Sequence, residues 1–316
     1  MQMEWNQGKR NVLLVGQVYL DTILHVSGFP EEDTKTRANS VEQRIGGNTC
    51  NTAQVLTQFD HMNVCYMSAA GSRETSSYIT DMHKEKQIKD FFLYRDASIT
   101  PSSTIIHNEL TGSRTILSHN DIQDITCAEF RETFNHLNKY DNWWVHFEGR
   151  NISETVFQID WLSNKATDEG WRRQLVISVE LEKPLRDDIE CLIPRADIVF
   201  FSKIFAQHHG FKDAISFLKN WDVLNTQLKP SAKAFCTWGE DGAAVLDNET
   251  KTFYHAPVLH KIEKVIDTVG AGDTFNAGII SCLSRNGQDI KSATQYACTL
   301  ATNKVAQKGF DGLSLI

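Results

Sequence analysis

Apolar runs recur along the chain, and polar or amphipathic stretches separate them. The first run covers residues 11–20 and ends at Asp21, and its continuous apolar character predicts one strand that is buried on both faces. Similar short runs lie at residues 143–147, 175–179, 197–201 and 234–238, with amphipathic stretches between them. This alternation of strands and helices predicts an α/β fold with a mainly parallel central sheet, covered by helices on both faces.

Two stretches have patterns that do not suit a buried sheet. Residues 34–44 carry Lys, Arg, Asn and Gln with little apolar content, which is typical of strands that contact water on both faces. Residues 101–119 have the pattern of a β-hairpin whose turn lies around 109–112. We therefore expect a small β-strand lid, formed by about residues 22–45 and 101–119, on a single domain that spans residues 1–316.

Three segments have the character of helices. Residues 49–59 follow the pair Gly46-Gly47, which interrupts the preceding run, and they contain a group of Ala, Val and Leu residues. Two further helices are predicted near the end of the sequence, over residues 273–285 and 289–307. No apolar run approaches the length of about 20 residues that a membrane span needs, so we expect no membrane partner.

The composition narrows the class of protein. A chain of 316 residues, of which 41% are apolar, is long enough to bury a large core. Its formal charge of -8 argues against nucleic acid as a partner, because phosphate backbones attract basic surfaces. Seven cysteines without Cys-x-x-Cys spacing are typical of reduced thiols, so we expect a cytoplasmic protein.

The most informative motif is Asp-Thr-Val-Gly-Ala-Gly-Asp-Thr-Phe-Asn-Ala-Gly, at residues 267–278. Gly270, Ala271 and Gly272 carry little or no side chain, so a phosphate group can approach their backbone N–H groups closely. The sequence that follows predicts a helix with Asp273 in its first turn, and the N-terminus of a helix stabilises an anion. A carboxylate beside such a phosphate site suits a kinase, which removes a proton from an alcohol while charge develops on the transferred group.

A simpler interpretation of this motif is a glycine-rich turn followed by an Asp that caps a helix. Two other nucleotide-binding motifs are excluded. A dinucleotide fingerprint requires a small residue where Phe275 stands and a clear strand before Gly270, but only Val265-Ile266 precedes it. A Walker-type phosphate loop requires Gly-Lys-Ser or Gly-Lys-Thr, and the sequence contains neither triplet.

A second constellation lies near the start of the sequence and consists of Asp21, Gly46-Gly47-Asn48 and Asn51. Asn48 and Asn51 are separated by about one helical turn, so they share a helix face. Carboxamides donate and accept hydrogen bonds and a carboxylate accepts two, so these side chains suit the hydroxyl groups of a sugar. Each residue alone is also explained structurally, with Asn48 as a helix cap, Asn51 as an exposed helix residue and Asp21 as a turn former.

With both motifs present, the chain resembles the ribokinase-like (PfkB) carbohydrate kinases. Residues 46–51, Gly-Gly-Asn-Thr-Cys-Asn, and residues 267–273 match the two signatures of that family. Shorter matches extend from about residue 11 to residue 312 and resemble the family members that phosphorylate ketohexoses. These shorter matches include residues 29–33, 100–103, 114–116, 146–151, 182–184, 201–203 and 309–312.

The resemblance implies a role for each matching residue. Asp273 is the expected catalytic base, which takes the proton from the sugar hydroxyl, and residues 270–272 are the expected anion hole around the transferred phosphoryl group. The expected substrate-binding residues are Asp21, Asp33, Gly47, Asn48, Asn51 and Asp273. The expected nucleotide-binding residues are Arg114, Gly239, Glu240, Asp241, Gly242, Gly270, Ala271 and Gly272.

The resemblance further implies ATP and Mg²⁺ as cofactors, and it leaves a requirement for K⁺ open. Residues 202–205, Ser-Lys-Ile-Phe, lack the carboxylate with which many family members order water around magnesium, so the residues that hold the metal are unknown. Asp33 matches a lid residue that enters the sugar site of a partner subunit, which implies a homodimer formed through the lid strands.

The expected reaction is the phosphorylation of D-fructose by ATP, which gives D-fructose 1-phosphate and ADP. A kinase of the same family for ribose, another hexose or a nucleoside is an alternative, because few pocket contacts decide the acceptor. A second alternative is a catalytically silent sugar or nucleotide sensor on the same fold. The presence of Asp273 argues against a sensor, which has no need of a base at that position.

Overall fold

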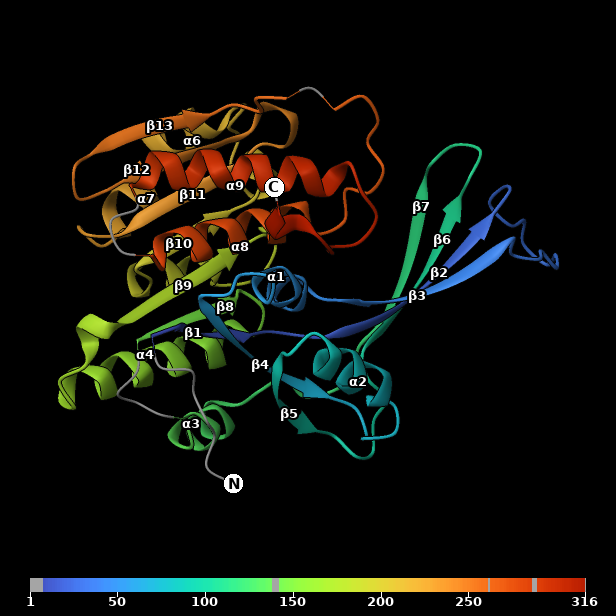
Figure 1. Cartoon of the computed structure of the whole chain (residues 1–316), viewed down its shortest axis with the longest axis horizontal. Coiled ribbons are helices and arrows are strands. Elements are labelled where there is room, and N and C mark those ends of the chain that lie inside the picture. Colours follow the sequence, from blue (N-terminus) through green and yellow to red (C-terminus); the bar gives the residue numbers. More distant parts are fainter. Residues whose placement is uncertain (1–7, 138–141, 261, 286–288, 316) are drawn as a thin grey trace.

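The computed structural model describes residues 8–137, 142–260, 262–285 and 289–315. A nine-stranded sheet forms its centre (Figure 1), in the order β13 (Thr252–Ala256), β12 (Ala243–Asp247), β11 (Lys233–Thr237), β10 (Ile198–Phe201), β9 (Leu175–Leu181), β8 (Trp143–Glu148), β1 (Arg10–Val15), β4 (Met62–Ala70) and β5 (Lys89–Tyr94). The strands from β11 to β5 pair in parallel, and β12 and β13 extend the sheet in antiparallel orientation. The predicted α/β fold with a mainly parallel sheet is confirmed.

Helices cover both faces of this sheet (Figure 1). One face carries α3 (Cys127–Asn135), α4 (Ile152–Asp168), α5 (Lys203–His208), α6 (Ala214–Asn220) and α7 (Asp222–Gln227), and the other carries α1 (Asn48–Leu56), α2 (Ser77–Glu85), α8 (Ala271–Leu283) and α9 (Ile290–Val305). Short 3₁₀ turns lie at η1 (Arg172–Gln174), η2 (Ile189–Arg195), η3 (Gly239–Asp241) and η4 (Leu313–Leu315). Successive strand residues point to opposite faces, so Leu13 packs in one apolar layer and Leu14 in the other. Both faces are therefore apolar, which explains the continuous apolar runs of the sequence.

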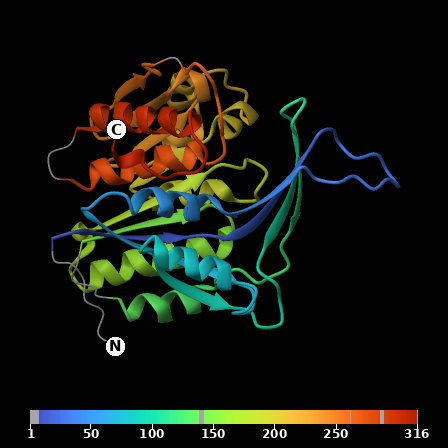
Figure 2. The same cartoon turned by 45° about the vertical axis from the view of Figure 1, so that its right-hand side comes forward.

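A second sheet of four strands projects from the body (Figures 1 and 2). We call it the lid sheet, and its order is β3 (Ser40–Gly46), β2 (Tyr19–Val26), β6 (Ser102–Asn108) and β7 (Arg114–His119). β2 pairs with β3 in antiparallel orientation and with β6 in parallel, and β6 and β7 form an antiparallel hairpin. The hairpin predicted at residues 101–119 is confirmed. The strand predicted over 34–44 is shorter than expected, because β3 begins only at Ser40.

The first apolar run is two strands and not the single core strand that the pattern predicts. β1 ends at Val15, and the chain then leaves the central sheet and enters the lid sheet as β2. Gly16 marks this departure, because a Cβ atom there would collide with Thr49 and lie 2.8 Å from Oε2 of Glu148. The apolar pattern continues across the junction because Val18 is also buried. Asp21 consequently lies within a lid strand and not at the end of a core strand.

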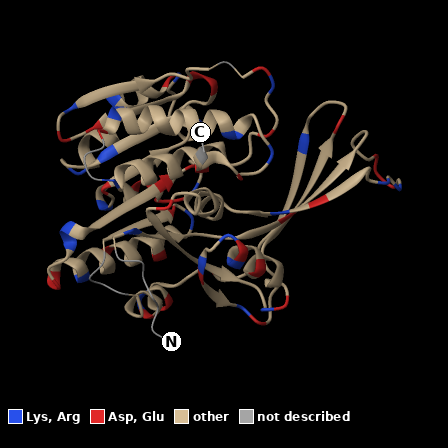
Figure 3. Cartoon of the chain, in the orientation of Figure 1, with Lys and Arg blue, Asp and Glu red and all other residues tan. Residues whose placement is uncertain are grey.

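Charged residues of both signs occur throughout the described chain, over the body and the lid sheet (Figure 3). Among the helices that the structure describes, none has both the length and the apolar content needed to cross a membrane. All seven cysteines are free thiols.

Candidate active site

A cavity of about 760 Å³ lies between the carboxyl edge of the central sheet and the lid sheet. In open parallel sheets this is the edge at which ligands bind. Its lining combines residues of β2 and β3 with the first turns of α1 and α8 and the carboxyl ends of β9 and β10. The predicted site residues that line it are Asp21, Gly47, Asn48, Asn51, Gly270, Ala271, Gly272 and Asp273. The two sequence motifs, which are about 220 residues apart in the chain, therefore meet in one cavity.

Asp273 lies in the first turn of α8, and its side chain is buried at the cavity. Asn51 of α1 donates a 2.8 Å hydrogen bond from Nδ2 to Oδ2 of Asp273. Burial, followed by the nearby charge of Glu180, raises the pKa of Asp273 well above its ordinary value, while the hydrogen bond from Asn51 opposes the rise. A raised pKa makes the carboxylate a stronger proton acceptor, which suits a general base. Asn51 is thus the partner of Asp273 and not an exposed helix residue.

The anion loop, which we define as residues 267–272, leads directly into α8. Gly270 has a φ of 77°, a left-handed conformation that glycine adopts without strain. A Cβ atom at Gly270 would lie 2.5 Å from Cε1 of Phe310, whereas one at Gly272 would have no other atom within 4 Å. The first N–H groups of an α-helix have no acceptor within the helix, so this turn offers donors to an anion in the cavity.

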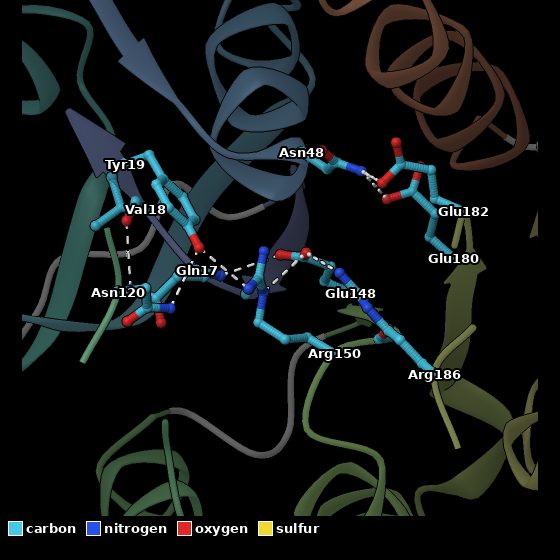
Figure 4. A network of polar contacts seen from close by, with 12 residues as sticks. Gln17, Val18, Tyr19, Asn48, Asn120, Glu148, Arg150, Glu180, Glu182 and Arg186 are labelled. Carbon is cyan, nitrogen blue, oxygen red and sulfur yellow. Dashed lines mark hydrogen bonds and ion pairs between the residues drawn. The ribbon is translucent and has the colours of Figure 1, made fainter. Parts of the chain in front are cut away.

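Two carboxylates that the sequence motifs did not identify lie at the end of β9. Asn48 donates hydrogen bonds from Nδ2 to Oε2 of Glu180 at 3.0 Å and to Oε2 of Glu182 at 2.9 Å (Figure 4). Asn276 donates a third, of 3.0 Å, to Oε1 of Glu180. Burial, with a contribution from Glu182, raises the pKa of Glu180 to about 8. The sequence could have indicated both carboxylates by their position directly after the apolar run 175–179, because the carboxyl ends of parallel strands meet at the ligand-binding edge.

Two glycines and one carboxylate shape the lid side of the cavity. Asp21 reaches the cavity from β2, and a Cβ atom at Gly46 would lie 3.0 Å from its Cγ, so glycine makes room for this carboxylate. Burial raises the pKa of Asp21, and a hydrogen bond with Ser103 opposes this shift. Gly47, with a φ of 102°, is the residue that precedes α1. Asn48 is therefore the first residue of the helix and not its cap, and its side chain is free to reach the acidic pair.

Asp267, the first residue of the anion loop, forms ion pairs with three cationic side chains. Its carboxylate lies 2.8 Å from Nη1 of Arg44, 3.1 Å from Nζ of Lys304 and 3.8 Å from Nη2 of Arg114. Burial alone would raise the pKa of Asp267, but the N–H group of Val269 and the charge of Lys304 hold it below its ordinary value. Arg114 thus lies beside the anion loop, and its predicted contact with the ATP phosphates stays a prediction. Sequence reasoning did not identify Arg44 and Lys304, because a single cation in a polar strand or an amphipathic helix belongs to no recognisable motif.

The predicted site residues that do not line this cavity are Asp33, residues 239–242 and Arg114, which instead lies beside Asp267. Asp33 lies in the exposed connection between β2 and β3, with a φ of 59°. Gly239, Glu240 and Asp241 form the turn η3 after β11, and Gly242 follows with a φ of 88°. The cavity reaches only as far as Thr237 on that strand. The predicted roles of Asp33 and of residues 239–242 therefore stay predictions.

The sequence has relatives along its whole described length. The profile of the pfkB family carbohydrate kinases matches residues 9–314. The chain is 32% identical over 306 residues to the ketohexokinase of Mus musculus, a match that covers 96% of this chain and 99% of that protein. It is 22% identical over 315 residues to a nucleoside kinase of Methanothermobacter thermautotrophicus, covering 95% of this chain and 91% of that protein.

Solved structures resemble the fold more closely than they resemble the sequence. The ribokinase of Giardia lamblia superposes with a TM-score of 0.77 at 17% identity, covering 97% of this chain and 96% of that one. The ribokinase of Cryptococcus neoformans in complex with ADP superposes with a TM-score of 0.67 at 14% identity, covering 96% and 95%. These matches confirm the ribokinase-like fold that the sequence motifs led us to expect.

Proposed function

This chain belongs to the pfkB family of carbohydrate kinases, and we propose that within the family it phosphorylates D-fructose with ATP, giving D-fructose 1-phosphate and ADP. Family membership makes it a phosphotransferase. The choice of fructose is supported by the similarity to mouse ketohexokinase along nearly the whole of both chains. The observation that carries the proposal is the buried carboxyl of Asp273, which shares one cavity with the anion loop and the polar residues Asp21 and Asn48.

In the proposed reaction Asp273 accepts the proton of the 1-hydroxyl of fructose. The hydroxyl oxygen attacks the γ-phosphorus of ATP, the bond from phosphorus to the β,γ-bridging oxygen breaks, and ADP leaves with that oxygen. Asn51 holds Oδ2 of Asp273, so Oδ1 is available to the sugar. The N–H groups of the first turn of α8 stabilise charge on the transferred group, and general-base assistance contributes about 10²–10⁴ in rate.

The proposed sugar subsite is formed by Asp21, Gly47, Asn48 and Asn51. Because Nδ2 of Asn48 donates to Glu180 and Glu182, its Oδ1 is left to accept a hydrogen bond from a sugar hydroxyl. The Asp21 carboxylate comes from the lid sheet, so a bound sugar would connect the lid to the body. Such a connection favours a closed lid, which excludes water that would otherwise compete with the sugar for the phosphoryl group.

The proposed nucleotide subsite begins at the anion loop. Arg114 and Arg44 both reach Asp267 from lid strands, so both guanidinium groups stand where they would meet phosphate oxygens. The turn of residues 239–242 follows a strand at the same sheet edge, and we propose that it contacts the nucleoside part of ATP.

Magnesium is proposed as the companion of ATP. Mg²⁺ takes oxygen ligands, keeps several of its waters and neutralises phosphate charge when it is bound. Glu182 fits this group, because its carboxylate lines the cavity and its carbonyl oxygen accepts a 2.7 Å hydrogen bond from Oγ of Ser202. We propose that Glu182 supplies the magnesium-ordering carboxylate that residues 202–205 lack. No cluster of three or more His, Cys, Asp or Glu side chains suited to a metal is present within the described ranges.

A homodimer through the lid sheet is also part of the proposal. Leu117 of β7 is 62% exposed, and a large exposed apolar residue on an edge strand suits a protein partner. In such a dimer Asp33, which does not line the cavity of its own chain, would approach the cavity of the partner.

The function is tested by a coupled ADP-release assay with fructose, ribose and adenosine as acceptors. We expect the highest kcat/KM with fructose, and NMR of the product should place the phosphate on carbon 1. Preference for ribose or adenosine would assign the chain to another acceptor. Binding of sugar and ATP without any turnover would identify a sensor and refute the kinase proposal.

A further inference from the structure

Lys304 is a buried charge that the proposed reaction does not use. It lies in the last turn of α9, and its side chain is fully buried. Lysine is almost never fully buried unless it is paired, because removal of an ammonium group from water is costly. Nζ of Lys304 lies 3.1 Å from Oδ2 of Asp267 and donates a 3.1 Å hydrogen bond to the carbonyl oxygen of the same residue. The ammonium group therefore holds the side chain and the backbone of the first residue of the anion loop.

The same end of α9 also holds the anion loop through backbone hydrogen bonds. The N–H groups of Ile266 and Asp267 both donate to the carbonyl oxygen of Val305, at 2.8 Å and 3.2 Å. Within the loop, the N–H group of Val269 donates to Oδ1 of Asp267 at 3.1 Å. The position of Asp267 is thus set by α9, and Asp267 in turn sets the backbone of the loop. α9 packs along α8 (Figure 1), so it is a rigid support for this arrangement.

Lys304 further contacts the aromatic ring that covers the loop. Its Nζ lies 5.2 Å from the centroid of the Phe310 ring, within the range of a cation–π interaction. The ring packs on Gly270, since a Cβ atom there would lie 2.5 Å from Cε1 of Phe310. One ammonium group consequently fixes the anion loop at two points, directly at Asp267 and through Phe310 at Gly270.

The charges around Asp267 indicate that the Lys304 ammonium group leaves other cations available to bind a phosphate. Four cations meet two carboxylates there, namely Arg44, Arg114, Lys304 and Lys308 with Asp267 and Glu42. Lys304 neutralises Asp267 from the protein interior. Arg44 and Arg114 could therefore turn toward a phosphate without leaving Asp267 as an unpaired, buried carboxylate. The excess positive charge suits a polyphosphate.

We propose that Lys304 is a positioning residue for phosphoryl transfer, a cation built into the protein that holds the anion loop in its phosphate-binding conformation and leaves Arg44 and Arg114 available to ATP. This inference rests on the proposed function for its chemistry. A purely structural role would lower the stability of the protein without a selective effect on the nucleotide. A positioning role predicts instead a selective loss of nucleotide affinity, and this difference distinguishes the positioning role from the structural one.

The test is the affinity for the non-hydrolysable analogue AMP-PNP, measured by calorimetry on the full chain with and without the substitution Lys304→Met. We expect Lys304→Met to weaken AMP-PNP binding about tenfold or more, because the loss of one partner of a buried pair leaves Asp267 uncompensated. The fructose dissociation constant should stay within about threefold, since the sugar subsite does not touch Lys304. Both affinities are measured well below the unfolding temperature of each variant.

Lys229→Met is the matched control. Nζ of Lys229 also donates to a backbone carbonyl oxygen, of Arg195 at 2.7 Å, and also pairs with a carboxylate, of Asp197 at 3.3 Å. Asp197 directly precedes β10 and Lys229 lies in the segment before β11, so this pair is at the opposite end of these strands from the cavity. This control loses one carbonyl contact and one ion pair, as the Lys304 variant does, from a side chain that is 29% exposed, and it should bind AMP-PNP as the unsubstituted protein does.

The outcomes separate this inference from the proposed function. Equal AMP-PNP affinities for the Lys304 and Lys229 variants would overturn the positioning role, and so would a parallel loss of fructose and AMP-PNP affinity. The AMP-PNP comparison needs no sugar, so it decides the role of Lys304 even if the protein phosphorylates a different acceptor. Failure of the unsubstituted protein to phosphorylate fructose would refute the acceptor and leave the role of Lys304 to this comparison.

Discussion

Two glycines of the anion loop should respond in opposite ways to the addition of one methyl group. Gly272 lines the cavity, and a Cβ atom there would have no other atom within 4 Å. Alanine is favoured over glycine in a helix by up to about 1 kcal/mol, so Gly272→Ala should leave the free energy of unfolding unchanged or slightly higher. The methyl group nevertheless occupies space that a phosphate needs for close approach to the backbone. We expect kcat/KM for ATP to fall about tenfold or more, equivalent to about 1.4 kcal/mol.

Gly270→Ala should instead destabilise the protein. A left-handed backbone conformation costs a non-glycine residue about 1–2 kcal/mol, and Gly270 has a φ of 77°. The collision of the new methyl group with Phe310 adds about 1–3 kcal/mol, as overpacking of a filled site does. The expected loss of about 2–5 kcal/mol is a large fraction of the stability of about 5–15 kcal/mol that is typical of a folded domain.

The assay combines urea unfolding with steady-state kinetics at a saturating sugar concentration. Gly170→Ala is the control, because Gly170 has a φ of 78°, has open space at the Cβ position and lies outside the cavity. It should show the backbone strain alone, with unchanged kinetics. An unchanged kcat/KM for ATP in Gly272→Ala would show that no phosphate approaches this backbone closely.

Two further predictions concern the carboxylates. Glu180 has a folded pKa of about 8 against an ordinary value of 4.5, so the folded protein binds the additional proton between these values and loses stability as the pH rises through the folded pKa. The unfolding free energy relative to Glu180→Gln should therefore fall between about pH 5 and pH 9 in urea titrations, and a difference that is constant with pH would contradict a protonated Glu180. Asp33→Ala should raise the KM for sugar about tenfold and spare that for ATP, if a partner's lid completes the sugar subsite. An unchanged sugar KM, or a monomer in analytical ultracentrifugation, would contradict the shared site.

The sequence predicted the parts of the fold that have a regular pattern. The strands at 143–147, 175–179 and 234–238 were placed within a few residues, because burial on both faces makes a strand continuously apolar. The helix that starts at Ala271 was identified from its glycine-rich approach and its small apolar residues. Hydrophobicity alone could not show that residues 11–20 divide between two sheets, because side chains on both sides of the junction are covered.

Only those residues of the site that stand in local sequence motifs could be predicted. Asp273, Asn48 and Asn51 were identified because they stand in short motifs with a chemical meaning. Glu180 contacts Asn48 across about 130 residues of sequence, and this contact arises from the order of the parallel strands. Lys304 likewise meets Asp267 only because α9 packs beside α8. Such partners are set by the tertiary fold, so no local pattern could have identified them.

In the proposed reaction everything depends on the Asp273 carboxylate, which accepts the proton of the attacking sugar hydroxyl. The most direct test is kcat for Asp273→Asn, which keeps the size and the neighbours of the side chain and removes its basicity. We expect kcat to fall by a factor of about 10²–10⁴, with the dissociation constants of fructose and AMP-PNP within a few fold of the unsubstituted values. A variant that retained near-normal kcat would contradict this role of Asp273.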